Sequence, residues 1–175
     1  MAMLRHVAEK VVLLRPLWAL ILLFFGPCIV VPISLFVPDG YLEGTASAIC
    51  MLFYVGWPYL VTVYFGGPFE IVSTKRLHLL TVCLIYVVSF NFFALHIHEL
   101  LMTDGVIKRI AEGVLILLVA WCTLFVMWSA AQAMTRVERD RSISANSTLP
   151  TFFLFLLLPF GVWFIRRRIQ RIYLP

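Results

Sequence analysis

The residues best suited to chemistry are two histidines and a glutamate near the middle of the chain. His96, His98 and Glu99 form an H-x-H-E group at the end of a long apolar run. Imidazole and carboxylate groups are common ligands of zinc and other divalent metals. Residues 96 and 99 share a helix face and residue 98 does not, so a metal site needs a further ligand such as Asp104 or Glu112. The alternative is a pair of histidines at a helix end, beside a solvated carboxylate.

The sequence contains no other catalytic motif. Nucleophilic catalysis needs Ser or Cys near a general base, and no G-x-S-x-G motif occurs. The cysteines lie in separate apolar runs without a C-x-x-C pair, which favours packing roles. They are Cys28, Cys50, Cys83 and Cys122. We predict no catalytic residue and no cofactor, and we favour a protein that is not an enzyme.

The composition requires a membrane. The 175 residues are 62% hydrophobic and 13% charged, whereas a soluble domain carries about 25% charged residues. The mean hydropathy of +0.98 leaves too few polar residues to coat a soluble fold. The net charge is +5, and Lys and Arg stand at the ends of apolar runs, where they set orientation and contact anionic headgroups. We therefore expect the lipid bilayer as a partner and no nucleic acid.

The apolar runs predict an all-α membrane protein, a four-helix transmembrane bundle in a single domain over residues 1–175. The predicted spans cover about 17–37, 46–65, 77–97 and 114–134, and an amphipathic helix over residues 1–16 precedes them. No Asp, Glu, Lys or Arg falls inside these four spans. An ion-coupled transporter or a voltage sensor needs such residues, so the sequence argues against both classes.

Polar residues inside the spans predict contacts between helices. Ser89 and Asn91 lie in the third predicted span, and Ser129 and Gln132 lie in the fourth. Such side chains commonly join transmembrane helices by hydrogen bonds. The alternative is that they line a polar path or a headgroup pocket.

The C-terminal segment, residues 149–173, decides the topology. Its apolar run, residues 152–165, is about 21 Å of helix, against a hydrocarbon core of about 30 Å. Arginines follow at once, and a crossing would carry them to the face opposite the other basic residues. They are Arg166, Arg167, Arg168 and Arg171. We predict a re-entrant or interfacial helix with these arginines at the membrane surface; the alternative is five transmembrane helices.

The distribution of basic residues places the amino terminus in the cytoplasm, because three basic residues precede the first span and the first loop has none. We expect a multi-pass protein of a bacterial inner membrane or of a plasma or organelle membrane.

We expect a membrane-embedded subunit or effector that acts by helix–helix association, as a homo-oligomer or within a membrane complex, and that could form or gate a pore. The alternative is a membrane enzyme or lipid-binding protein that uses His96, His98 and Glu99.

Overall fold

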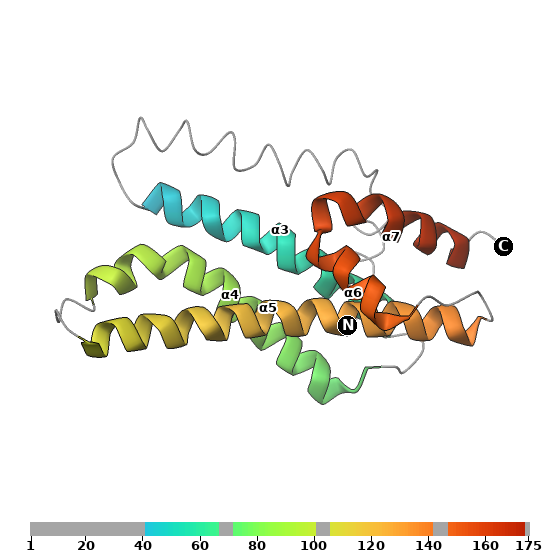
Figure 1. Cartoon of the computed structure of the whole chain (residues 1–175), viewed down its shortest axis with the longest axis horizontal. Helices are drawn as coiled ribbons and strands as arrows, with labels where there is room; N and C mark the ends of the chain where they lie inside the picture. The colour runs from blue at the N-terminus through green and yellow to red at the C-terminus, as the bar shows by residue number, and fades with distance from the viewer. Residues whose placement is uncertain (1–40, 67–71, 101–105, 142–146, 174–175) are drawn as a thin grey trace.

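A computed structural model describes residues 41–66, 72–100, 106–141 and 147–173, and within these ranges the chain folds into five helices and no strand (Figure 1). The helices are α3 (Tyr41–Gly66), α4 (Thr74–Leu100), α5 (Val106–Asp140), α6 (Thr148–Leu156) and α7 (Leu158–Tyr173). The predicted amphipathic helix over residues 1–16 and the predicted span 17–37 lie outside the described residues.

Three of these helices are long and apolar enough to cross a membrane. The candidate spans are Ser47–Phe65 in α3, Thr74–Phe93 in α4 and Arg109–Asp140 in α5, with 19, 20 and 32 residues. About 20 apolar residues suffice to cross the hydrocarbon core. The described chain is therefore helical, and three of its helices could cross a membrane. These candidate spans overlap the predicted spans 46–65, 77–97 and 114–134.

The core joins all five helices. α3 packs against both α4 and α5, and α6 packs against α5 and α7. Trp57 on α3 is 9% exposed, and its ring centroid lies 5.8 Å from that of Phe155 on α6. Phe65, Met134 and Ile169 belong to the same buried cluster. This cluster places α6 and α7 beside the carboxyl half of α5 (Figure 1).

The C-terminal segment forms two short helices that pack on each other. α6 has nine residues and α7 has sixteen, so they are about 13 Å and 24 Å long, each shorter than the hydrocarbon core of about 30 Å. The helices approach closely at Gly161, where a Cβ atom would overlap the backbone carbonyl oxygen of Leu154. Only a residue without a side chain fits this close approach. We call α6 and α7 together the C-terminal hairpin.

Candidate functional site

Polar side chains from different helices meet near the carboxyl end of α5. Arg76, in the first turn of α4, donates from Nη2 to Ser129 Oγ at 3.2 Å and to Gln132 Oε1 at 2.6 Å. The guanidinium also lies 5.9 Å from the ring centroid of Phe125, close enough for cation–π attraction. The first turn of α4 is thereby fixed to α5 by one cation.

A buried ion pair joins α5 to the C-terminal hairpin. Arg168 on α7 donates from Nε to Glu138 Oε1 at 2.7 Å, and its Nη2 pairs with Glu138 Oε2. Its Nη1 donates to Thr151 Oγ1 on α6 at 2.8 Å. The side chains of Arg168 and Glu138 are 11% and 4% exposed. One guanidinium thus contacts both α5 and α6, in the fork geometry that suits carboxylate recognition.

Apolar packing surrounds this ion pair. Ile165, Ile169 and Ile172 on α7 are all at most 2% exposed and belong to the cluster that contains Met134. Near the end of α7, Arg141 donates from Nη1 to the backbone carbonyl oxygen of Ile172. A basic side chain at a helix carboxyl end satisfies a carbonyl that has no partner within the helix. The hairpin is therefore held by a row of isoleucines, an ion pair and a helix cap.

The four arginines that the sequence assigns to the membrane surface do not share one environment. Arg167 and Arg171 are exposed and Arg166 is partly exposed, whereas Arg168 is engaged by Glu138. Sequence reasoning missed this pair, although a signal was present. Residue 168 lies three positions after Ile165 and four before Ile172, which places it on the isoleucine face of the helix. Contact between the other arginines and headgroups remains a prediction.

The predicted interhelical polar residues have the following surroundings. Asn91 Oδ1 accepts a hydrogen bond from Ser47 Oγ on α3 at 3.0 Å, and its Nδ2 donates to the Val87 carbonyl on its own helix at 2.8 Å. Ser129 and Gln132 accept from Arg76. Ser89 is partly buried on α4.

The predicted metal ligands cannot be compared with the structure. His96, His98 and Glu99 fall in the last turns of α4, but their side chains lie outside the described residues. Among the side chains that are described, no three or more from His, Cys, Asp and Glu are grouped closely enough to hold a metal ion. The metal site therefore stays a prediction.

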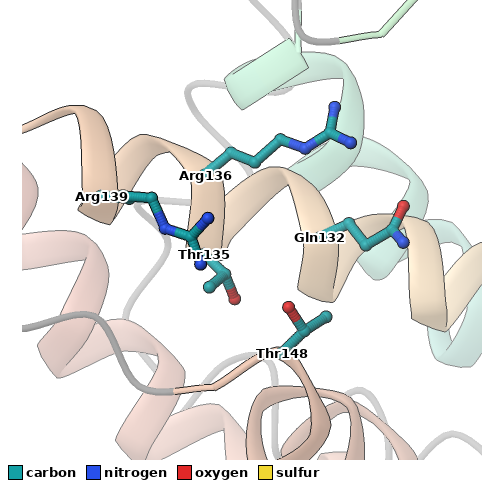
Figure 2. A pocket seen from close by; sticks show the side chains of 5 residues that line it. All are labelled: Gln132, Thr135, Arg136, Arg139 and Thr148. Atoms are coloured by element: carbon teal, nitrogen blue, oxygen red, sulfur yellow. The ribbon is translucent and has the colours of Figure 1, made fainter.

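Two open hollows lie along α5, and α6 contributes one lining residue to each. The first, the polar pocket, has a volume of about 150 Å³ and is lined by Gln132, Thr135, Arg136, Arg139 and Thr148 (Figure 2). The second, the aromatic groove, has a volume of about 240 Å³ and is lined by Trp121, Leu124, Phe125, Trp128 and Phe152. Basic and hydroxyl groups line the first, and apolar and aromatic groups line the second.

Comparison with known proteins gives no further guidance. No protein-family model, no curated protein and no solved structure matches this chain. The functional argument therefore rests on the geometry of the helices and their side chains.

Proposed function

We propose that the chain is a small multi-pass membrane protein that acts as a membrane-embedded subunit or effector through helix–helix association. The C-terminal hairpin is the element that associates. The observation that carries the proposal is the buried ion pair between Glu138 on α5 and Arg168 on α7. It gives the hairpin one specific docking position at the end of the bundle.

The energetics of such a pair suit an exchangeable contact. Removing two charges from water costs nearly as much free energy as their attraction returns, so a buried pair selects a geometry more than it adds stability. The remaining contact is the row formed by Ile165, Ile169 and Ile172. Another helix with the same apolar row and one arginine could occupy the same position. The hairpin of a second copy has both features, and exchange of identical elements is a common route to homo-oligomers.

The same geometry supports a re-entrant topology. Thr148, at the start of α6, and Arg168, on α7, both lie near the carboxyl end of α5. Both helices of the hairpin are shorter than the hydrocarbon core of about 30 Å. We propose that the hairpin enters and leaves on the cytoplasmic face, after four spans, as the basic residues of the sequence predict. A fifth span is the competing topology.

The outer faces of α4 and α5 offer a second surface for association. Leu79, Val82 and Ile85 on α4 are exposed, as are Val114 and Leu117 on α5. In a bilayer such faces meet either lipid or another helix. Association along them could form or gate a pore, which an ion-flux assay on the protein in liposomes would detect.

Charge complementation tests the exchange of hairpins. One tagged copy carries Glu138→Arg and a differently tagged copy carries Arg168→Glu. Each copy alone has two like charges at the docking position, whereas exchange between the copies restores both ion pairs. We expect the two copies to co-purify in mild detergent when they are expressed together, and each to lose stability when expressed alone.

A matched control uses Arg167→Glu in the second copy, because Arg167 is an exposed neighbour and makes the same change of charge. This copy should not rescue Glu138→Arg. Failure of the complementary pair to co-purify, together with a strictly monomeric wild-type protein that binds no partner, would exclude the proposed function.

The alternative, an enzyme or lipid-binding protein with a His/Glu metal site, remains a proposal that rests on the sequence alone. Its test is the metal content of the purified protein, compared with that of a variant carrying both His96→Ala and His98→Ala. Equal metal content and equal lipid turnover in the two proteins would eliminate this site.

A further inference from the structure

The polar pocket and the aromatic groove lie end to end along one face of α5. Their lining residues on α5 recur with the i, i+3, i+4, i+7 pattern of a single helix face. They are Trp121, Leu124, Phe125, Trp128, Gln132, Thr135, Arg136 and Arg139. On α6, Thr148 and Phe152 stand one turn apart, and they contribute to the pocket and to the groove respectively. The two hollows therefore form one elongated site with a polar end and an apolar end.

The apolar end has the dimensions of a lipid chain. Trp128 and Phe152 form an edge-to-face pair, with 5.5 Å between their centroids, and Trp121 is 69% exposed. From Trp121 to Trp128, the outermost groove residues on α5, the helix rises by about 10 Å. The hydrocarbon core is about 30 Å thick, so the groove is long enough for part of one acyl chain.

The polar end has the chemistry of a phosphate site. Arg139 is exposed and lines the pocket with Arg136. Two guanidinium groups at one pocket favour an anionic ligand, because charge-assisted hydrogen bonds to phosphate are strong. The adjacent acid, Glu138, is engaged by Arg168.

The start of α6 adds hydrogen-bond donors to the pocket. Thr148 is the first residue of α6, and its hydroxyl lies toward that of Thr135 on α5 across the cavity (Figure 2). Ser147, at the N-cap position, makes no capping hydrogen bond with its side chain. The first backbone N–H groups of a helix and its positive dipole end attract phosphate. The N–H groups at the start of α6 add to the attraction that the arginines exert on an anion, but they do not define the site alone.

We propose that this face binds one anionic phospholipid, with its phosphate in the polar pocket and an acyl chain in the aromatic groove. Phosphate alone would use only the polar end, whereas the collinear apolar groove selects a ligand with a hydrocarbon chain. The site needs α5 and one α6. A second copy supplies that α6 when hairpins are exchanged, so lipid binding can be measured whether or not the association proposed above occurs.

Tryptophan fluorescence offers a direct readout, because Trp121 and Trp128 line the groove. The full chain is reconstituted in phosphatidylcholine vesicles that contain a minor fraction of phosphatidylglycerol or phosphatidylcholine with brominated acyl chains. Bromine quenches tryptophan on contact. We expect stronger quenching by the anionic brominated lipid at equal mole fraction. An Arg136→Gln, Arg139→Gln variant should lose this preference, by about fivefold in relative affinity for each arginine.

The control variant, Arg167→Gln with Arg171→Gln, removes the same charge from the exposed face of α7 and should keep the preference. Should Arg136→Gln prevent folding, Arg139→Gln alone should still show a loss of about fivefold. Equal quenching by the two lipids in the wild-type protein overturns the proposal, and so does an equal loss in the pocket and control variants. Removal of the preference by excess inorganic phosphate would assign the pocket to free phosphate instead of lipid.

Discussion

The two halves of α5 both contribute to the apolar run 114–134 but have opposite surroundings. The carboxyl half is packed inside the protein, and its buried apolar residues are Val126, Met127, Ala130, Ala131, Ala133, Met134 and Val137. The amino half exposes large side chains, namely Ile110, Val114, Ile116, Leu117, Leu118 and Trp121. Hydropathy identifies the apolar run 114–134, which extends into both halves, but does not separate the part that contacts protein from the part that faces outward.

Residue size separates the two halves. Three of the buried residues are alanines, and small side chains let transmembrane helices approach closely. The exposed residues are branched or aromatic and offer large surfaces to lipid or to another helix. Polar anchors strengthen the difference, because Ser129 and Gln132 bind Arg76 while Glu138 binds Arg168. The carboxyl half is therefore the structural centre of the molecule.

The largest expected effect comes from Glu138→Leu, which leaves Arg168 buried without its carboxylate. Breaking a buried pair on one side costs about 3–5 kcal/mol. Thermal unfolding of the purified protein in detergent should show this loss, and a Glu138→Leu, Arg168→Leu double variant should recover most of it. The matched control is Asp140→Leu, since Asp140 is exposed on the same helix. If Glu138→Leu is as stable as the wild type, the carboxyl half of α5 is not the structural centre of the molecule.

A smaller but still clear effect is expected from Gly161→Ala. The added methyl group would overlap the Leu154 carbonyl oxygen, and overpacking of this kind typically costs about 1–3 kcal/mol. Gly113→Ala is the matched change on the amino half of α5, where a Cβ atom would meet nothing within 4 Å. It should leave the unfolding temperature unchanged or raise it slightly, because Ala is the better helix former. Equal effects at both positions would contradict the proposed difference in packing.

Arg76→Gln should have a moderate effect. The shorter neutral side chain loses the hydrogen bonds to Ser129 and Gln132, and the expected cost to the free energy of unfolding is about 1 kcal/mol. Lys75→Gln provides the comparison, because Lys75 is exposed next to Arg76. A parallel unfolding measurement should show little change for Lys75→Gln. Equal free energies of unfolding for Arg76→Gln and Lys75→Gln would mean that Arg76 does not hold α4 to α5.

The smallest effect is expected from Leu117→Ala on the amino half. Leu117 is 70% exposed, so truncation leaves no internal cavity, and the unfolding free energy should change by less than about 0.5 kcal/mol. A loss well above this value in the membrane-reconstituted protein would show that another helix covers this face, which would sharpen the proposal of association.

Much of the helical framework could be predicted from the sequence, because a bilayer requires long apolar segments bounded by charge. The predicted spans at 46–65, 77–97 and 114–134 fall within the longer helices α3, α4 and α5. The helices extend further since charged and polar residues at their ends continue the backbone hydrogen bonds. Hydropathy measures only the apolar core of each helix, so it underestimates helix length.

The candidate site was less accessible to prediction. Glu138 and Arg168 are separated by 30 residues, and neither lies inside a predicted span, so a search for intramembrane charges passes over both. The spacing of Ile165, Ile169 and Ile172 puts them on one face of a helix, and all three are buried. Periodicity cannot tell whether such a face meets lipid or protein, because both are equally apolar.

The close approach at Gly161 has a consequence for how this protein can evolve. A related chain that keeps the hairpin has no freedom at this position, because every other amino acid carries a Cβ atom that the Leu154 carbonyl oxygen excludes. The position of Gly113 is open to substitution. As homologous sequences diverge, the first glycine should persist and the second should drift.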